Sequence, residues 1–411
     1  METHLTPSIQ VTLAGQEAES ILRKCVHCGF CTATCPTYQL FGDELDGPRG
    51  RIYLIKQMLE GGTVSEKTQL HLDRCIGCRS CETTCPSGVR YLRLLDVGRS
   101  VLEQRVARRP MDQLKRFALR RLLPLRWLFL PAYRLAQLLR PLLPATLKNK
   151  VLAYRAPGER PQTPKTRSMI ALAGCVQQTM APSINAAAAR VLHRLGIQLE
   201  EAERAGCCGA LPQHLDGLAQ ARNVARRNID AWWPLLEAGA EAILITASGC
   251  ATQVRDYGYL LQDDPAYAAK AARVASLSKD VSEILAAEKN QLLALLSARP
   301  MPAPGRKLAF HVPCSLQHGL QIRGMVEEFL SAAGFALTPV ADAHLCCGSG
   351  GAYSVLQPEI AQQLLHNKLA TLTAGQPLDI ATANIGCLAH LQSGTRLPVR
   401  HWIEIIDERL S

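Results

Sequence analysis

Two cysteine runs of one form decide how this chain folds: Cys25-Val-His-Cys28-Gly-Phe-Cys31-Thr-Ala-Thr-Cys35-Pro36 and Cys75-Ile-Gly-Cys78-Arg-Ser-Cys81-Glu-Thr-Thr-Cys85-Pro86. Cysteine makes up about 4% of the chain, so three further cysteines at set offsets would follow a given cysteine by chance about six times in 100,000. Zinc sites usually have two closely spaced cysteines and a second such pair further along the chain, whereas four cysteines spaced this closely are typical of an iron–sulfur cluster. The runs therefore predict two [4Fe–4S] clusters.

The spacing C-x2-C-x2-C-x3-C-P is that of bacterial two-cluster ferredoxins, in which the fourth cysteine of each run binds the cluster of the other run. We therefore expect one [4Fe–4S] cluster on Cys25, Cys28, Cys31 and Cys85, and the other on Cys75, Cys78, Cys81 and Cys35. Between the runs, Ile52, Ile55 and Leu59 recur at helical spacing before Gly61-Gly62. This pattern predicts a helix there, and so an α-helical type of ferredoxin domain.

Several cations lie close to these cysteines in the sequence: Arg23, Lys24, Arg51, Arg74 and Arg79. A thiolate-ligated cluster carries net negative charge, so a cation beside it would stabilise it and raise its reduction potential. For any one of these residues, the alternative is a solvated surface charge.

The remaining eight cysteines form a second repeat. In the first copy Cys175 is followed by Cys207-Cys208-Gly209 and then by Cys250; in the second copy Cys314 is followed by Cys346-Cys347-Gly348 and then by Cys387. The flanking residues match as well, since Met169–Cys175 corresponds to Leu308–Cys314. An internal duplication of about 120–140 residues is the economical explanation.

Each copy alternates short apolar runs with helical stretches such as Ser183–Leu195, which predicts βαβ units and a parallel sheet. Parallel sheets bind ligands at the carboxyl ends of their strands, where the single cysteines fall. Four sulfurs could therefore meet in each copy and hold a further iron–sulfur cluster or a zinc ion, because four thiolates suit either. The alternative is that these thiols only pack, as buried free cysteines often do.

The composition is that of a soluble multidomain protein. The 411 residues are 47% hydrophobic and 20% charged, which excludes a disordered tail protein and a multi-span membrane protein. The N-terminus lacks the charged start and apolar core of a signal peptide, so we expect a cytoplasmic location and reduced cysteines. No G-x-G-x-x-G follows an expected strand, and we therefore expect neither FAD nor NAD in this chain.

The segment Leu114–Lys150 is basic, rich in leucine and free of acidic residues, and four prolines interrupt it. It is too broken to span a membrane, but it could lie on an anionic membrane surface or contact a partner, or simply pack on the rest of the chain. These patterns divide the chain into a ferredoxin domain over residues 1–110, the basic segment and a proline-rich linker over 111–165, and two cysteine-rich domains over 166–300 and 301–411.

These motifs resemble a family that joins an N-terminal two-[4Fe–4S] ferredoxin domain to two cysteine-rich CCG domains. Its members include the iron–sulfur subunits of glycolate oxidase and of anaerobic glycerol-3-phosphate dehydrogenase, and subunits of heterodisulfide reductase. The variants Cys-Val-His-Cys-Gly-Phe-Cys and Gly-Pro-Arg-Gly-Arg look most like those of glycolate oxidase. The resemblance implies an electron-transfer subunit of a glycolate (2-hydroxy-acid) dehydrogenase complex, which is inactive alone. Partner FAD-containing subunits would oxidise glycolate to glyoxylate, and the electrons would pass to a membrane acceptor such as quinone at the inner face of the cell membrane.

The chain departs from the heterodisulfide reductases at the end of each copy, where that group has Cys-x-x-Cys. Here Cys250 is followed by Ala-Thr-Gln253 and Cys387 by Leu-Ala-His390, so the fifth thiol is missing and disulfide cleavage is disfavoured. His390 could replace it as a nitrogen ligand or could serve only in packing.

Other functions remain open on the sequence alone. The chain could be the iron–sulfur subunit of a lactate or glycerol-3-phosphate dehydrogenase, or a thiol–disulfide reductase. Nucleic-acid binding is least favoured, because most of the +11 net charge lies in the proline-broken segment.

Overall fold

The chain divides into two compact units in a computed structural model that describes residues 1–299 and 305–411. The N-terminal unit consists of Met1–Arg116 together with His344–Leu364. The repeat unit consists of Phe117–Ala343 together with Leu365–Ser411. The domain boundary expected between residues 300 and 301 lies outside the described residues.

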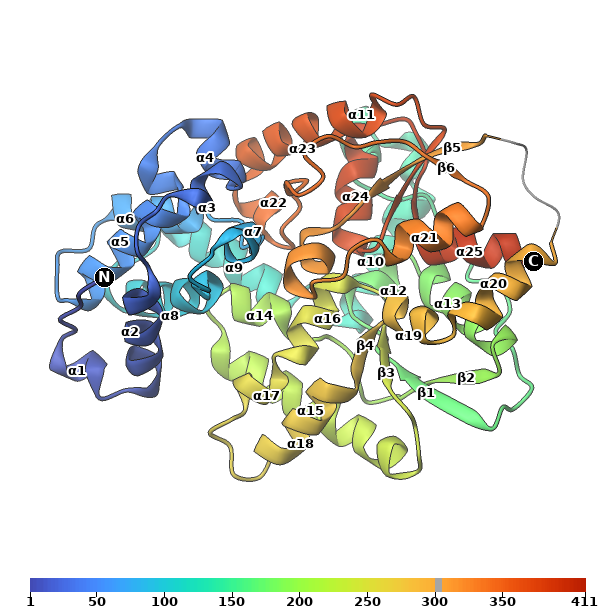
Figure 1. Ribbon diagram of the computed structural model, residues 1–411, viewed down its shortest axis with the longest axis horizontal. Coiled ribbons are helices and arrows are strands. Elements are labelled where there is room, and N and C mark those ends of the chain that lie inside the picture. The colour runs from blue at the N-terminus through green and yellow to red at the C-terminus, as the bar shows by residue number, and fades with distance from the viewer. Residues whose placement is uncertain (300–304) are drawn as a thin grey trace. The chain divides into compact units, whose positions relative to one another are not determined.

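The N-terminal unit is built from helices, as the sequence predicts (Figure 1). Its elements are α1 (Pro7–Gln10), α2 (Leu13–Lys24), α3 (Phe30–Ala33), α4 (Pro36–Phe41), the 3-10 turn η1 (Glu44–Asp46), α5 (Pro48–Leu59), α6 (Glu66–Asp73), α7 (Ser80–Thr84), α8 (Tyr91–Arg105) and α22 (Tyr353–Leu356). Helix α9 (Pro110–Arg121) contains the division between the units at residue 116, and α23 (Pro358–Thr373) contains the one at residue 364.

Helix α5 is the one predicted between the cysteine runs, and its bounds confirm the prediction. Pro48 occupies its first turn, where the missing N–H costs no hydrogen bond, and Gly61, with φ +91°, follows its end. The buried side chains of Ile55 and Leu59 pack in a core with α2 and α8. Gly98 on α8 permits close packing, because a Cβ there would lie 2.8 Å from Ile55.

A segment from the second cysteine repeat, His344–Leu364, completes the N-terminal unit. Tyr353 on α22 donates a hydrogen bond of 2.9 Å from its hydroxyl to the backbone oxygen of Arg74. Leu40 and Ile76 pack against a small core on this segment, made of Tyr353, Ile360, Ala361 and Leu364. The second repeat therefore contributes directly to the core of the ferredoxin part.

The repeat unit contains two copies of one α/β architecture. The first copy comprises β1 (Arg167–Ala171), α12 (Val176–Met180), α13 (Ser183–Arg194), β2 (Ile197–Glu201), α14 (Ala210–His214), α15 (Leu218–Glu237), β3 (Ile243–Ile245), α16 (Ser248–Arg255), α17 (Tyr257–Leu260), α18 (Ala268–Leu277), β4 (Ser278–Asp280), α19 (Val281–Ala287) and α20 (Lys289–Ser297). The second copy comprises β5 (Lys307–His311), the short π-helical turn η3 (Ser315–Gly319), α21 (Met325–Ala332), β6 (Ala336–Leu337), β7 (Asp379–Thr382), α24 (Ile385–Gly394), β8 (Val399–His401) and α25 (Trp402–Leu410).

The two sheets have the same strand order, β2-β1-β3-β4 in the first copy and β6-β5-β7-β8 in the second. All their strand pairs are parallel, with Ile170 opposite Ile243 in one sheet and Ala309 opposite Ile380 in the other. This confirms the predicted parallel sheets and the internal duplication. Helix α13 matches the predicted helix at Ser183–Leu195 to within a residue.

The two copies are joined by polar side chains near the carboxyl ends of their strands. The hydroxyls of Ser248 and Ser315 lie 2.7 Å apart, and the side-chain amide of Asn384 donates to both. The ring nitrogen Nε2 of His401 lies 2.9 Å from the backbone oxygen of Thr246. These contacts bring α16, η3 and α24, the elements that carry or adjoin Cys250, Cys314 and Cys387, to one edge of the repeat unit.

The basic segment folds as α9, α10 (Arg126–Leu138), the 3-10 turn η2 (Arg140–Leu142) and α11 (Ala145–Lys148). Its apolar side chains are unusually exposed, with Trp127 74%, Leu138 76% and Leu142 81% accessible to solvent. Among the described residues, no helix combines the length and the apolar character needed to cross a membrane.

Candidate metal centres

The first cysteine loop and the last cysteine of the second run lie together. Cys25, Cys28, Cys31 and Cys85 all line one cavity. Burial raises the pKa of the Cys31 thiol to about 11, and the neighbouring thiols of Cys25, Cys85 and Cys28 add to this rise. Thiols that are crowded and buried together ionise readily only when a cation compensates their charge, so this cavity fits a metal cluster.

The second loop has the matching arrangement. Burial raises the pKa of the Cys81 thiol well above its ordinary value, and the charges of Cys78, Cys75 and Cys35 act in the same direction. Cys35, the last cysteine of the first run, is therefore a neighbour of the second loop. The structure thus places Cys85 near the first loop and Cys35 near the second, and the division of the eight cysteines between two clusters stays a prediction.

The two loops share one backbone conformation. In the first loop His27 and Gly29 have φ of 55° and 84°, and in the second loop Gly77 and Arg79 have φ of 71° and 63°. These are corresponding positions, two and four residues after the first cysteine of each run. Left-handed residues at both positions curl the chain so that successive thiols turn inward, and glycine serves once in each loop because it adopts this region without strain.

A buried arginine, Arg51, lies beside the second set of cysteines. Its side chain is 1% exposed, and its Nη2 is 3.4 Å from the Oδ1 atom of the buried carboxylate Asp46. Burial alone would lower the pKa of Arg51, but the thiols of Cys75 and Cys35 and the groups of Tyr91 and Asp46 raise it above its ordinary value. A permanent positive charge therefore lies among the thiols of this set.

Hydrogen bonds hold that arginine in place. Arg51 donates from Nε to the backbone oxygen of His71 at 2.7 Å and from Nη1 to the hydroxyl of Thr37 at 3.1 Å. The same hydroxyl lies 3.3 Å from the Cys35 sulfur. Arg74 also binds Asp46, at 2.6 Å, whereas Arg23 and Arg79 pair with nearby glutamates. Of the five cations near the runs, Arg51 is the one that the structure buries against the thiols.

The four cysteines of the first repeat meet at the carboxyl end of its sheet. The thiols of Cys175 and Cys208 donate hydrogen bonds to the Cys207 sulfur, which lowers the pKa of Cys207 well below its ordinary value. Cys208 also hydrogen-bonds with Cys250, and the pKa of Cys208 is raised. The backbone N–H of Gly209 donates to the Cys207 sulfur at 3.4 Å. The predicted convergence of four sulfurs is thus present in this copy.

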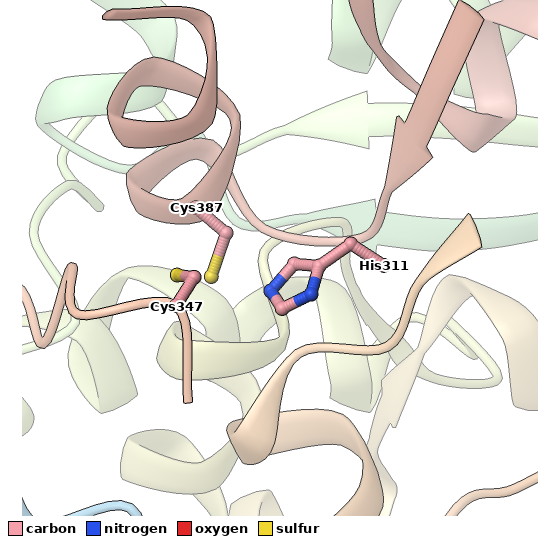
Figure 2. A group of neighbouring side chains, drawn as sticks. All are labelled: His311, Cys347 and Cys387. Atoms are coloured by element: carbon pink, nitrogen blue, oxygen red, sulfur yellow. The ribbon is translucent and has the colours of Figure 1, made fainter. Parts of the chain in front are cut away.

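The second repeat presents a nitrogen as well as sulfurs. His311, Cys347 and Cys387 each offer one ligand atom, and these atoms all lie within 4.8 Å of one another (Figure 2). Cys314 stands at the start of η3, and the Cys346 sulfur accepts a bond of 3.5 Å from the N–H of Gly348. Burial, together with the charges of Lys368 and His390, lowers the pKa of His311 to about 3, so its imidazole is neutral at physiological pH.

His311 is a candidate ligand that the sequence analysis missed. It stands three residues before Cys314, where the first copy has Leu172, so comparison of the two copies carries the signal. His390, the nitrogen ligand considered from the sequence, is buried on α24 near His311.

Within the N-terminal unit, the segment that carries Cys346 lies near the second set of ferredoxin cysteines. Burial raises the pKa of the Tyr353 hydroxyl above its ordinary value, and both Cys75 and Cys346 contribute to this rise. Tyr353 is therefore close both to Cys75 of the ferredoxin loops and to Cys346 of the second Cys-Cys-Gly motif.

Comparison with known proteins assigns both parts of the chain. Residues 21–89 match the 4Fe-4S dicluster domain family, and residues 170–255 and 308–392 match the cysteine-rich domain family. The glycolate oxidase iron-sulfur subunit of Escherichia coli K12 is 52% identical, over 100% of this chain and 99% of that protein. The probable glycolate oxidase iron-sulfur subunit of Bacillus subtilis 168 is 30% identical, over 92% of this chain and 89% of that protein. Lactate utilization protein A of an Exiguobacterium strain is 25% identical, over 57% of this chain and 94% of that protein.

A dicluster ferredoxin domain followed by two cysteine-rich domains defines an iron–sulfur protein of electron transfer. Within that class the match over the full length is decisive. The chain belongs to the family of glycolate oxidase iron–sulfur subunits.

The crossed arrangement predicts an unequal effect of Cys35→Ser. We expect this substitution to damage the cluster associated with Cys75, Cys78 and Cys81, because Cys35 lies with that set. Electron paramagnetic resonance of the reduced protein distinguishes the two clusters. Loss of only the cluster beside Cys25 and Cys31 would contradict the crossing.

The buried charge of Arg51 predicts a change in reduction potential. Arg51→Gln should lower the potential of the second cluster and leave the first unchanged, because a cation stabilises the extra electron of the reduced state. Asp46→Asn, which removes the opposing negative charge, should raise the potential of the second cluster. Arg51→Lys keeps the positive charge, so its potential should lie between those of Arg51→Gln and the wild-type protein. Redox titration followed by electron paramagnetic resonance measures both clusters. Shifts of one sign in all three variants would indicate structural damage instead.

Proposed function

We propose that this chain is the electron-carrying subunit of a membrane-associated glycolate dehydrogenase. The oxidation of glycolate to glyoxylate releases two electrons and two protons, and the first acceptor would be an FAD in a partner subunit. Two [4Fe–4S] clusters, when bound, supply one-electron carriers between that flavin and a membrane acceptor such as quinone. The observation that carries the proposal is the pair of four-cysteine sets within one compact unit.

In this proposal Cys25, Cys28, Cys31 and Cys85 hold the first cluster, and Cys75, Cys78, Cys81 and Cys35 hold the second. Cys28 is exposed, so the first set reaches the surface of the N-terminal unit, where a partner can approach it. The neighbouring side chains of Val26 and Phe30 are also exposed, at 67% and 62%. A partner that covered them would exclude water from the path of the electron.

The second set of ferredoxin cysteines lies near the segment that carries Cys346. This proximity supports the second repeat as a further site on the electron-transfer path. Burial raises the pKa of the Tyr353 hydroxyl, and the charges of Cys75 and Cys346 both raise it further, so this side chain lies near a cysteine of each site. That proximity supports electron transfer between the two sites. The cysteines of both repeats are candidate ligands in this scheme: Cys175, Cys207, Cys208 and Cys250 in the first copy, and Cys314, Cys346, Cys347 and Cys387 in the second.

Lactate is the alternative substrate of the complex, supported by the relatives named lactate utilization protein A. Those relatives are 24–26% identical and match only 57% of this chain, whereas the glycolate oxidase relatives extend over nearly all of it. The extent of the match therefore favours glycolate.

The basic segment supports a location on the inner face of the cell membrane. Trp127, Leu138 and Leu142 expose large apolar surfaces within a stretch that contains nine lysine and arginine residues and no acid. Apolar side chains that insert at the headgroup boundary, beside cations that attract anionic lipid, are the composition of a peripheral membrane anchor.

A tagged chain purified with its partners tests the electron-carrying role. We expect the preparation to contain flavin, to oxidise glycolate faster than lactate or glycerol 3-phosphate, and to reduce a quinone analogue. Cys25→Ser should still allow glycolate to bleach the flavin but should abolish quinone reduction, because substrate oxidation and electron transfer reside in different chains. The isolated chain should show no turnover with any of the three substrates. Turnover by the chain alone would contradict the proposal.

Vesicle binding tests the membrane anchor. Joint substitution of Trp127, Leu138 and Leu142 by serine should abolish sedimentation with phosphatidylglycerol vesicles and leave the clusters intact. Wild-type binding should weaken as salt rises, because the screening length falls to about 8 Å at physiological ionic strength. The matched control is Val11→Ser with Leu13→Ser, which removes two exposed apolar side chains elsewhere and should leave binding unchanged. If the triple variant and the control variant bound the vesicles equally well, the basic segment would not be the membrane anchor.

A further inference from the structure

The tyrosine at the start of α8, Tyr91, carries a buried hydroxyl that lacks a normal hydrogen bond. Its side chain is 3% exposed, and among the described residues no partner meets the distance and angle of a normal hydrogen bond to this hydroxyl. A buried polar atom without a partner is destabilising, and folded proteins rarely retain one without a reason. A tyrosine hydroxyl can donate one hydrogen bond, so an acceptor close to it would be such a reason.

Tyr91 lies in the same core as cysteines of both ferredoxin sets. Cys25, Cys75 and Cys81 are buried in this core, and all of them belong to the N-terminal unit together with Tyr91. Tyr91 also lines the cavity that contains the first set of four cysteines. The tyrosine is therefore beside both sets, and the position of its hydroxyl decides which sulfur can accept the bond.

The hydroxyl interacts with the second set. Burial raises the pKa of the Tyr91 hydroxyl well above its ordinary value, and the charge of Cys75 adds to this rise more than that of Cys81. A hydrogen bond toward the Cys75 sulfur contributes as well, although it falls short of normal geometry. The position of the hydroxyl therefore favours Cys75 as its acceptor.

Ligation of a cluster would make Cys75 a better acceptor. A thiol sulfur accepts hydrogen bonds only weakly, whereas the thiolate that binds a cluster carries negative charge. Hydrogen bonds to charged acceptors are shorter than neutral ones and about twice as strong, so the contact from Tyr91 should tighten. The tyrosine keeps its proton at physiological pH, because even a solvated phenol has a pKa of about 10.

We propose that the Tyr91 hydroxyl donates a hydrogen bond to the Cys75 sulfur when that sulfur holds the second [4Fe–4S] cluster, and thereby raises the reduction potential of this cluster. The inference rests on the assignment of Cys75 to the second cluster in the proposed function. A hydrogen bond to a ligand sulfur stabilises the reduced state, which carries one more negative charge than the oxidised state. Tyr91 would then favour the passage of one electron from the first set to the second, with no proton transferred.

Redox titration of the cluster-loaded, full-length chain, followed by electron paramagnetic resonance, tests the proposal. Tyr91→Phe removes one oxygen atom and keeps the ring, so the variant should fold. At the potential that reduces half of the second cluster in the wild-type protein, we expect its ratio of reduced to oxidised form to fall about tenfold, which is about 59 mV for one electron. The first cluster should keep its potential. An unchanged second potential, or a shift confined to the first cluster, would overturn the proposal.

Tyr353→Phe is the matched control. The hydroxyl of Tyr353 is also buried near Cys75, but it donates to the backbone oxygen of Arg74 at 2.9 Å instead of facing a sulfur without a bond. Its loss should leave the potential of the second cluster unchanged. An equal shift in both variants would show that the loss of any nearby hydroxyl has this effect, and would overturn the specific role of Tyr91.

A second measurement detects the hydrogen bond itself. Electron–nuclear double resonance of the wild-type protein in deuterium oxide should show an exchangeable deuteron coupled to the second cluster, and Tyr91→Phe should lack it. If Tyr91→Phe fails to fold, the wild-type spectrum still decides, because the absence of such a deuteron contradicts the hydrogen bond. A wild-type protein with fewer than two cluster signals would overturn the proposed function and this inference with it, whereas two signals without the deuteron would overturn the inference alone.

Discussion

The N-terminal unit depends on one constraint, which is that each cysteine loop must lie beside the last cysteine of the other run. Cys85 lies near the first loop and Cys35 near the second, so two distant stretches of chain meet at both ends. Helix α5 has to pack between them, and its Arg51 places a positive charge where thiols crowd. Asp46 in turn has to be buried beside Arg51, because a lone cation would be costly to remove from water. The packing of the helical core and the burial of Arg51 with Asp46 therefore depend on where Cys35 and Cys85 lie.

Much of this organisation could be predicted from the sequence because the signals are periodic or repeated. Helices α5 and α13 have apolar spacing with glycine just beyond their ends, and the parallel sheets follow from the alternation of strands and helices. The neighbours of the ferredoxin cysteines were predictable because the spacing of the runs defines a known pairing. Arg51 was one of five equivalent cations in the sequence, since burial depends on tertiary packing that no local pattern records.

Other features have no local signature. His311 ends an apolar strand and looks like an ordinary core residue, and only its alignment with Leu172 marks it as different. The packing of His344–Leu364 with Leu40 and Ile76 depends on apolar residues that belong to no motif. The second Cys-Cys-Gly also departs from the first, because helix α14 begins directly after Gly209 whereas α22 begins only at Tyr353. Gly350, which lies in between, has a packing role, since a Cβ there would lie 2.8 Å from Ile76.

The segment His344–Leu364 has a consequence for the modularity of the chain. By sequence it is the middle of the last domain, yet its core residues are part of the first unit. A ferredoxin domain cut off after residue 110 would lose the cover of Leu40 and Ile76 and the partner of the Arg74 carbonyl. Duplication of the cysteine-rich domain therefore did more than add a second copy. A ferredoxin part transferred without this segment would therefore expose the apolar side chains of Leu40 and Ile76 to water.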